Sequence, residues 1–236
     1  MNASVSPATV DPSQAIGQMA VQLPGATAVF RRLKLDFCCG GQVSLRQASA
    51  DQGLDLQAVV DELSALQRPS ELPEAGTPSA LIEHILARYH EVHRAQLPEL
   101  IRMASRVEAV HRDHPDVPAG LADALEAMHG ELLTHMHKEE AILFPMLRAG
   151  GNSFATQPIA MMRHEHNDHG AALEHLAGLT HDITPPAGAC NTWRALYTGL
   201  AQLREDLIHH IHLENNVLFP QFEAPAAQGC GSSGCG

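Results

Sequence analysis

The chain has 236 residues, which is enough for one large domain or two smaller ones. It carries 27 acidic residues against 15 basic ones, and the formal net charge of −12 is dispersed, with no basic patch. This balance argues against nucleic acid and against an anionic membrane surface as partners.

The N-terminal residues show neither the basic nor the apolar region of a secretory signal, and no apolar run approaches the length needed to span a membrane. We therefore expect a cytoplasmic protein. Its five cysteines suggest no disulfide framework and are expected to be thiols or metal-reactive groups. All 16 histidines lie between His84 and His212, so the first 83 residues differ chemically from the rest.

Helical signals dominate from the N-terminus onward, and residues 1–68 predict a small helical domain. Asp11 followed by proline is typical of a helix start and predicts a helix to about Leu23. A second helix is expected over residues 26–33. Ser44 and Asp55 are suitable N-caps for two more.

A turn is predicted between the second and third of these helices, at Asp36-Phe-Cys-Cys-Gly-Gly41. Two adjacent glycines favour backbone conformations that other residues avoid. The turn presents the neighbouring thiols of Cys38 and Cys39. Adjacent cysteines in such a turn are poorly suited to an ordinary structural disulfide, and a nearby helix N-terminus favours a thiolate. Simple packing of the two thiols is the alternative.

Proline and glycine mark residues 69–79 as a linker, after which residues 80–222 contain four long amphipathic segments. Short connections between four helices predict an up-down-up-down bundle. Residues 223–236 are rich in Ala, Gly and Ser and predict a flexible tail. The expected connections within the bundle are residues 113–120, 149–153 and 184–191.

The second and fourth bundle segments contain near-copies of one motif, from His135 to Pro145 and from His210 to Pro220. In each copy a glutamate follows the histidine by four residues, so both side chains share one helix face. That face is otherwise apolar. A carboxylate buried there is costly unless a cation compensates it, and the motif therefore predicts a metal site.

The first and third segments each carry an inward His-x-x-His pair, His90 with His93 and His166 with His169. The bundle thus resembles a duplicated helix pair with ligands converging from both halves. Spacing alone leaves open which histidine of each pair is a ligand and which lines or supports the site. The alternative is a hydrogen-bonded polar network without metal, which leaves buried carboxylates uncompensated.

The same periodicity predicts which neighbours of the motifs are buried. It continues the apolar face beyond Glu139 through Ile142 and Met146, and beyond Glu214 through Val217. Five side chains fall off these faces and are expected to be solvated: His137, Lys138, Glu140, His209 and His212.

The types of ligand narrow the choice of metal. Four imidazoles and two carboxylates are too many for a tetrahedral zinc site, and calcium and magnesium prefer oxygen ligands. Imidazole with carboxylate suits iron or manganese, and two glutamates on facing helices can bridge two ions. A binuclear iron site is therefore favoured. Ferritin-like sites use Glu-x-x-His, whereas the order here is His-x-x-x-Glu.

These motifs resemble a known family, the iron–sulfur cluster repair di-iron proteins (the RIC family). The resemblance rests on five stretches and covers residues 12–222. It implies an all-α fold, in which a small N-terminal domain with a Cys-Cys turn precedes a hemerythrin-like up-down-up-down four-helix bundle. The stretches are residues 36–41, 89–100, 135–145, 165–166 and 210–220.

The resemblance also implies a ligand set and a cofactor of two iron ions. Matched position by position, Glu139 and Glu214 are the bridging carboxylates, and Cys38 and Cys39 are the family's vicinal pair. No role transfers to the tail cysteines, Cys230 and Cys235. The implied terminal ligands are His90, His135, His166 and His210.

The implied function is repair of iron–sulfur clusters damaged by nitric oxide or oxidants, with iron donated to damaged iron–sulfur proteins. Cys38 and Cys39 would help deliver iron or dock the recipient. The family implies a homodimer and a stress-response role without conventional enzymatic turnover. Two alternatives are a protein that binds and buffers nitric oxide or dioxygen, and a di-iron nitric oxide reductase. The latter needs an electron source, and no flavin or nicotinamide motif is visible.

Overall fold

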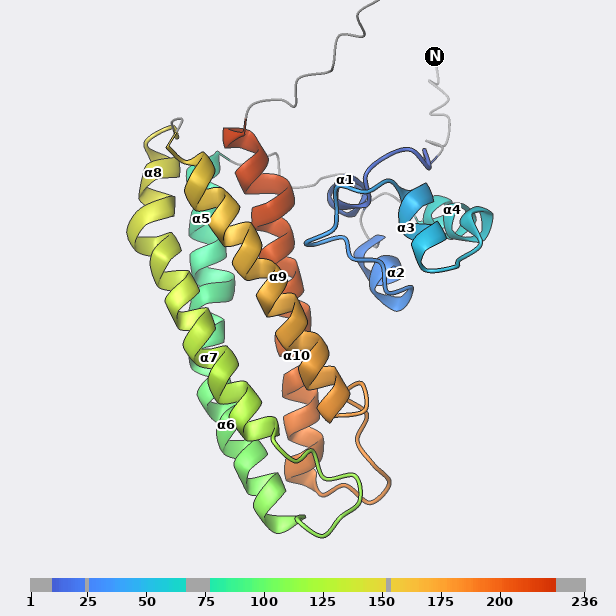
Figure 1. The fold of residues 1–236 in the computed structure, drawn as a ribbon, viewed down its shortest axis with the longest axis vertical. Coiled ribbons are helices and arrows are strands. Elements are labelled where there is room, and N and C mark those ends of the chain that lie inside the picture. Colours follow the sequence, from blue (N-terminus) through green and yellow to red (C-terminus); the bar gives the residue numbers. More distant parts are fainter. Residues whose placement is uncertain (1–9, 24–25, 67–76, 152–153, 224–236) are drawn as a thin grey trace, which may run out of the picture.

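The computed structural model describes residues 10–23, 26–66, 77–151 and 154–223 (Figure 1). Within these ranges the chain is helical and forms no strand, apart from one isolated bridge between Ala15 and Ser44. The predicted all-α class is confirmed. The proline-rich core of the expected linker and nearly all of the expected tail lie outside the described residues.

Four antiparallel rods form the bundle, and each rod contacts its two neighbours around the ring (Figure 1). The predicted up-down-up-down bundle is confirmed. Three rods contain a short π-helical turn, labelled η1, η2 or η3. The first rod is α5 (Pro78–Ile85), η1 (Leu86–His90) and α6 (Glu91–Val110); the second is α7 (Leu121–Lys138), η2 (Glu139–Leu143) and α8 (Phe144–Arg148); the third is α9 (Thr156–Leu179); and the fourth is α10 (Asn191–Leu213), η3 (Glu214–Leu218) and the 3-10 turn η4 (Phe219–Phe222).

The first rod begins at Pro78, two residues before the start expected from periodicity. The hydroxyl of Thr77 accepts a hydrogen bond from the amide of Ala80 at 3.3 Å, and proline occupies the first helical position. Both features are typical of helix starts, because the first backbone N–H groups of a helix have no partner within it. A side-chain oxygen can accept from one of them, and proline has no N–H group that needs a partner.

Two apolar clusters fill the bundle and leave a polar layer between them. The larger one surrounds Trp193, Leu121 and Leu203, which are fully buried. The smaller one, towards the other end, gathers around Ile82 and Phe219. The histidines and glutamates of the repeated motifs lie between these clusters, so rigid apolar packing on both sides holds them in place.

The π-helical turns change which side chains face the core. Ile142, expected inside, is 56% exposed, and Val217 is only half-buried. Leu143 and Leu218, each one position later, are buried in their place. A π-helical turn contains one residue more than an α-helical turn, so it rotates everything after it by about 100°. The predicted faces beyond Glu139 and Glu214 are therefore wrong by one residue.

In the described part of the N-terminal module the chain forms four short helices: α1 (Ile16–Gln22), α2 (Ala26–Arg32), α3 (Leu45–Asp51) and α4 (Leu56–Ala65). Ser44 and Asp55 cap α3 and α4 as predicted, through bonds of 3.2 and 2.9 Å to amides of the first turn. The first helix starts later than predicted. The Asp11 carboxylate instead closes a turn by accepting from the amide and hydroxyl of Ser13.

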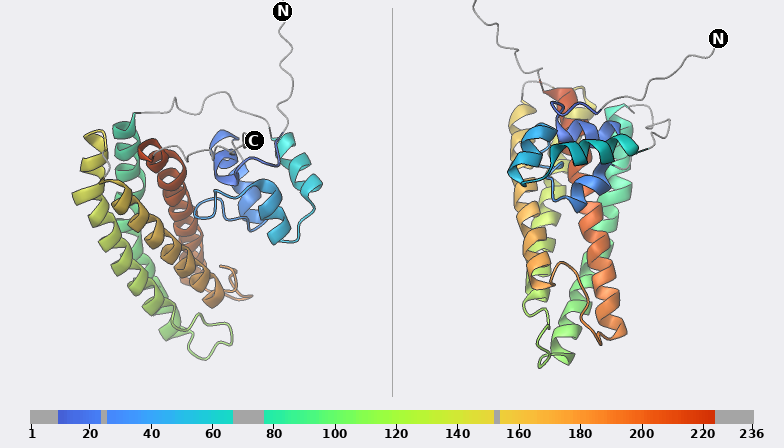
Figure 2. Two further views of the ribbon diagram at one scale, coloured as in Figure 1. Left: turned by 45° about the horizontal axis from the view of Figure 1, so that its top comes forward. Right: turned by 90° about the vertical axis from the view of Figure 1, so that its right-hand side faces the viewer.

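The module lies against the fourth rod of the bundle (Figure 2). The ring of Phe37 meets the ring of His212 edge-on, with 5.2 Å between centroids, and the Asn216 amide donates to the Phe37 carbonyl at 3.3 Å. His212 is therefore buried, at 5% exposure, although the bundle pattern predicts a solvated side chain. That prediction is wrong because the bundle's own periodicity contains no information about a covering domain.

Among the described helices, none combines the length and the apolar character that a membrane crossing requires.

Candidate metal centre

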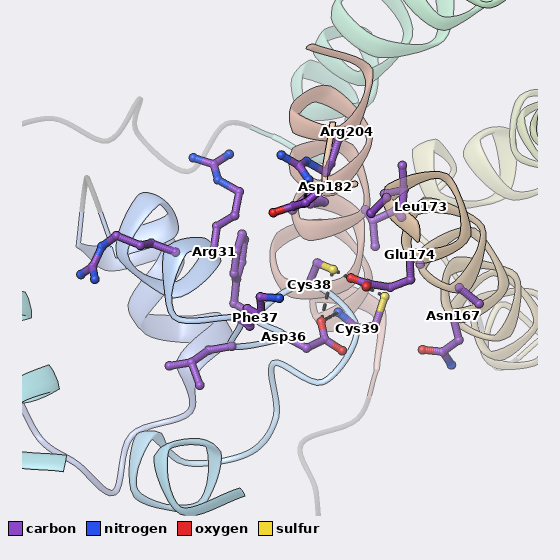
Figure 3. A pocket seen from close by; sticks show the side chains of 18 residues that line it. Arg31, Asp36, Phe37, Cys38, Cys39, Asn167, Leu173, Glu174, Asp182 and Arg204 are labelled. Atoms are coloured by element: carbon purple, nitrogen blue, oxygen red, sulfur yellow. Dashed lines mark hydrogen bonds and ion pairs between the residues drawn. The ribbon is translucent and has the colours of Figure 1, made fainter. Parts of the chain in front are cut away.

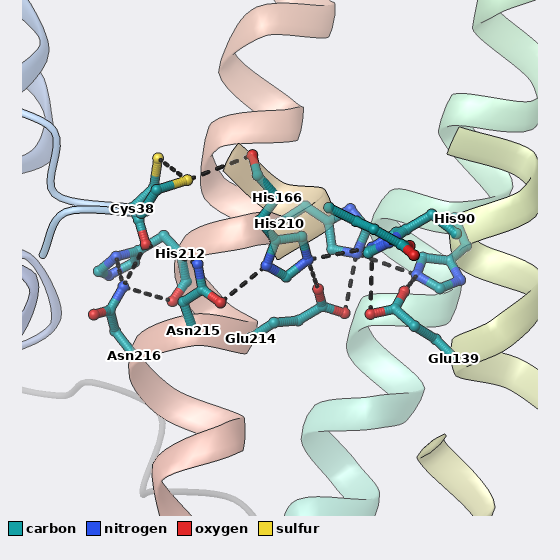
Figure 4. A network of polar contacts seen from close by, with 12 residues as sticks. Cys38, His90, Glu139, His166, His210, His212, Glu214, Asn215 and Asn216 are labelled. Carbon is teal, nitrogen blue, oxygen red and sulfur yellow. Dashed lines mark hydrogen bonds and ion pairs between the residues drawn. The ribbon is translucent and has the colours of Figure 1, made fainter. Parts of the chain in front are cut away.

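Six predicted ligands from all four rods converge in the polar layer between the two apolar clusters. Figure 4 labels five of them, from His90 to Glu214. Each is at most 1% exposed. Three of them stand at an end of a π-helical turn, since η1 ends at His90, η2 begins at Glu139 and η3 begins at Glu214. Such turns are frequent at functional sites. The six are His90, His135, Glu139, His166, His210 and Glu214.

The six residues form two groups that share both glutamates. In one group the Nε2 atoms of His90 and His210 are 3.1 Å apart, and in the other those of His135 and His166 are 3.2 Å apart. Two nitrogens bound at right angles to one ion, with bonds of about 2.1 Å, would lie about 3.0 Å apart. Each imidazole pair is therefore spaced as ligands of a common ion.

Each glutamate faces one histidine of each group. The oxygens of Glu139 lie 3.4 Å from Nε2 of His90 and 3.4 Å from Nε2 of His135. Those of Glu214 lie 3.2 Å from Nε2 of His210 and 3.0 Å from Nε2 of His166. Two oxygens on one carboxylate that point to different histidine pairs have the arrangement of a bridging ligand.

The charge state of the glutamates shows that the pocket suits a cation. Among the described residues, neither Glu139 oxygen has a hydrogen-bond partner. Burial, with the nearby negative charge of Glu214, raises the pKa of Glu139 to about 8. Burial also opposes ionisation of Glu214, but the imidazoles of His210 and His166 outweigh it and hold its pKa well below the usual range. A cation between the two carboxylates would compensate both charges.

Three of the four histidines are oriented by a hydrogen bond on the ring nitrogen that faces away from the pocket. The Nδ1–H of His90 donates to Glu140 at 2.7 Å, and that of His135 donates to Glu165 at 2.9 Å. With the proton held on Nδ1, the Nε2 lone pair is free to bind a metal. Glu140 is thus only 30% exposed at its side chain and is engaged with His90, not simply solvated.

The third such partner is Asn215, which the sequence reasoning missed. Its side-chain oxygen accepts from Nδ1 of His166 at 2.9 Å, and its side-chain amide donates to the carbonyl of Cys38 at 3.0 Å. One residue therefore contacts both a predicted ligand and the Cys-Cys turn (Figure 4). Its signal in the sequence is its place beside Glu214 in the repeated motif, where the first copy has Glu140.

His93 and His169 are buried beside the site but belong to neither group. No described residue is a hydrogen-bond partner of either ring. Burial and then the neighbouring His210 lower the pKa of His93 to about 2, while burial and then His166 lower that of His169 to about 4. Both rings are therefore neutral at physiological pH. Two unpartnered neutral imidazoles line the polar layer.

The Cys-Cys turn lies where the module meets α9. The Sγ atoms of Cys38 and Cys39 are 3.6 Å apart, and the Cys39 thiol donates to the backbone carbonyl of His166 at 3.5 Å. Both cysteines are half-buried. The structure thus places the two predicted cysteines next to the predicted metal ligand His166: Cys39 contacts its backbone directly, and Cys38 is linked to its side chain through Asn215.

The fold and this pocket define a cation-binding helical bundle, and comparisons with known proteins agree. Residues 81–222 match the hemerythrin HHE cation binding domain, and residues 12–67 match a domain of unknown function, ScdA_N (DUF542). The chain therefore belongs to the family of two-domain hemerythrin-like proteins that includes the iron–sulfur cluster repair protein YtfE. The sequence-based resemblance is confirmed.

Three relatives show how far this similarity extends, and each carries the name iron–sulfur cluster repair protein YtfE. The protein from Dickeya chrysanthemi is 48% identical over 211 residues, which cover 88% of this chain and 96% of the relative. That from Cronobacter sakazakii is 50% identical over 210 residues (88% and 95%). That from Yersinia pseudotuberculosis is 50% identical over 212 residues (89% and 96%).

Proposed function

We propose that the bundle holds two iron ions between its two groups of ligands. His90 and His210 would hold one ion, His135 and His166 the other, and Glu139 and Glu214 would bridge them. The observation that supports two ions is the sharing of both glutamates by the two histidine pairs. Imidazole and carboxylate ligands suit iron, a redox-active metal. The thiolates of a recipient protein can compete with these ligands for the iron.

The proposed activity of this protein is repair of damaged iron–sulfur clusters, with iron as the donated cargo. Relatives nearly half identical over most of their length carry that name. The chain's own residues support donation in a specific way. Both bridging positions are carboxylates, and no described thiol lies among the six proposed ligands, so softer sulfur ligands of a recipient can take the iron.

The Cys-Cys turn is the proposed point of contact with the recipient, a damaged iron–sulfur protein. Cys38 and Cys39 line a cleft of about 750 Å³ between the module and the bundle (Figure 3). Through Asn215 the same turn is linked to His166. A recipient docked in the cleft would therefore meet two thiols next to one end of the proposed di-iron centre.

The test of repair uses a cluster enzyme inactivated by nitric oxide. The iron-loaded protein is expected to restore its activity, and the Cys38→Ala/Cys39→Ala variant is expected to restore much less while keeping its iron. Cys190→Ala is the matched control, because Cys190 is also half-buried but lies against His111, away from the cleft. Equal repair by the double variant and the parent would contradict the proposed role of the turn.

Binding of nitric oxide is a second candidate, supported by the two unpartnered imidazoles of His93 and His169. A neutral imidazole beside a metal centre can offer a small uncharged ligand a hydrogen bond. Pure gas binding predicts a spectral change with nitric oxide and no transfer of iron to an acceptor. Loss of iron to an apo-acceptor favours donation instead.

A further inference from the structure

A second cluster of metal-binding atoms lies outside the bundle, in the turn that lines the cleft. The carboxylate of Asp36 and the thiols of Cys38 and Cys39 each offer one ligand atom, and these atoms lie within 4.8 Å of one another. Asp36 is exposed and the cysteines are half-buried, so the cluster faces the cleft (Figure 3). It shares no residue with the six proposed iron ligands.

The spacing of these atoms suits a single ion. Two thiolates bound tetrahedrally at about 2.3 Å lie about 3.8 Å apart, and a thiolate and a carboxylate oxygen bound to the same ion lie about 3.6 Å apart. The Cys38 and Cys39 sulfurs are 3.6 Å apart, and the Cys38 sulfur is 3.3 Å from Oδ1 of Asp36. These two separations are close to the edge lengths of a tetrahedral site, and all three ligand atoms lie within 4.8 Å of one another.

The turn is held in this shape by its own backbone and by the bundle. The amides of Cys39 and Gly40 donate to the two oxygens of Asp36, each at 2.9 Å. Gly41 has no room for a side chain, since a Cβ there would lie 2.4 Å from the carbonyl of Phe37. Asn215 fixes the Cys38 carbonyl from the bundle side. The three donors are therefore arranged before any ion arrives.

The protonation of the two thiols is compatible with metal binding. The two sulfurs share a hydrogen bond at 3.6 Å, in which one sulfur donates and the other accepts. An arriving divalent cation binds both sulfurs as thiolates, and the remaining protons leave to solvent. No oxidant or reductant is needed.

We propose that Asp36, Cys38 and Cys39 form a cation site for a thiophilic divalent ion of the Zn²⁺ or Fe²⁺ class, with a fourth position open to the cleft. Three protein ligands with an open fourth position allow a further ligand to bind the ion, whereas structural sites are closed by four protein ligands. Use of this site by iron leaving the bundle rests on the proposed repair function, whereas the site itself does not.

A competing explanation is that Asp36 only shapes the turn. The Asp36→Asn variant removes the charge and also one of the two backbone hydrogen bonds, because an asparagine has one acceptor oxygen where Asp36 uses both. The reactivity of the two thiols in the metal-free variant therefore shows whether the turn keeps its shape, and the affinities for the ion are compared once it does. If Asp36 is a ligand, Asp36→Asn binds the ion more weakly than the parent. If it only shapes the turn, the variant binds the ion as the parent does.

The experiment adds one equivalent of Zn²⁺ to the iron-loaded full chain and records zinc-edge X-ray absorption. The background carries Cys230→Ser and Cys235→Ser, which removes the thiols of the tail. We expect two sulfur ligands at about 2.3 Å and unchanged iron content. In a chelator competition, Cys38→Ser, Cys39→Ser and Asp36→Asn should each weaken zinc binding by more than about tenfold, since even the loss of a residue behind a ligand costs 10–100-fold. Cys190→Ser should leave the affinity unchanged.

Several results would overturn the site. Zinc coordinated only by nitrogen and oxygen, zinc that displaces iron from the bundle, or cysteine variants that bind zinc as tightly as the parent each contradict it. If the Asp36→Asn variant binds zinc as tightly as the parent, Asp36 is not a ligand of the site. The repair assay is independent of these results: if zinc binds through both sulfurs but Asp36→Asn repairs clusters at the parent rate, the site stands and its use in iron transfer fails.

Discussion

At the scale of single residues, the centre depends on two buried carboxylates, and the protein's own imidazoles stabilise the charge of only one of them, Glu214. Glu139 and Glu214 are fully buried, and no described group donates a hydrogen bond to either oxygen of Glu139. The raised pKa of Glu139 reflects this shortage of positive charge. The two glutamates therefore select for a bound cation more strongly than the histidines do, because a neutral imidazole needs none.

Removal of either carboxylate should reduce iron binding. Glu139→Ala and Glu214→Ala are each expected to lower the iron per chain by more than half, and the double variant to abolish it, while helical content by circular dichroism is retained. Glu99→Ala is the control, because Glu99 is exposed on the same bundle and, among the described residues, forms its ion pair with the nearby Arg102. Full iron content in the double variant would exclude the proposed bridging role.

Asn215 should affect both the centre and the turn. Asn215→Ala removes the partner of His166 and is expected to weaken iron binding by about 10–100-fold, measured by chelator competition. Asn215→Asp keeps an acceptor for His166 but loses the donor to Cys38, so it should retain iron and repair poorly. Asn216→Ala is the comparison, because Asn216 contacts the turn but not His166. If all three variants hold iron equally, Asn215 does not support the centre.

At the scale of elements, periodicity predicts the four bundle helices because an α-helix places a buried residue on the core face every three or four positions. Ile159, Met162, His166 and His169 follow that rule through α9, and all are buried. The rule fails after Glu139, where the π-helical turn shifts the face and buries Leu143 instead of Ile142. The extra residue carries no compositional signal that distinguishes it from α-helix.

The candidate site was predictable for a related reason. A charged residue on an otherwise apolar face is visible in the sequence, as at Glu139 and Glu214. The contacts of Glu165 and Asn215 do not show in the periodicity, because each residue hydrogen-bonds a proposed ligand on a different rod. The burial of His212 likewise depends on a domain far away in the sequence.

Close packing between the first and fourth rods should be sensitive to one glycine. A Cβ at Gly199 would lie 2.6 Å from a methyl of Leu100, and such overpacking costs about 1–3 kcal/mol. Because replacing a helical glycine offsets only about 0.5–1 kcal/mol of this cost, Gly199→Ala is expected to lower the free energy of unfolding. Gly130→Ala is the matched control within α7, where a Cβ meets nothing within 4 Å, and should raise it by about 0.5–1 kcal/mol. Urea unfolding measures both. Equal stability of the two variants would contradict the close approach of the rods.

At the scale of the whole molecule, the module packs against the bundle beside the proposed centre. The module covers His212 and places its thiols beside His166. The Arg31 and Glu205 side chains form an ion pair across the same interface. The module therefore lies where it can influence access to one end of the metal layer.

Removal of iron should destabilise the entire protein. Without a cation the six ligands stay buried, so the melting temperature of the iron-free protein is expected to fall by several degrees. A ligand present at 100 times its dissociation constant stabilises the folded state by about 2.7 kcal/mol. Differential scanning calorimetry before and after chelation measures this change, and re-addition of Fe²⁺ should restore the original melting temperature. Identical melting with and without iron would show that the buried carboxylates need no cation.

The central claim is that two bridging glutamates and four histidines hold a pair of iron ions. Mössbauer spectroscopy of anaerobically purified protein, combined with iron analysis, tests it most directly. The predicted result is two iron ions per chain with nitrogen and oxygen ligands and magnetic coupling through the shared carboxylates. One iron per chain, uncoupled iron, or iron bound by sulfur within the bundle would contradict the account.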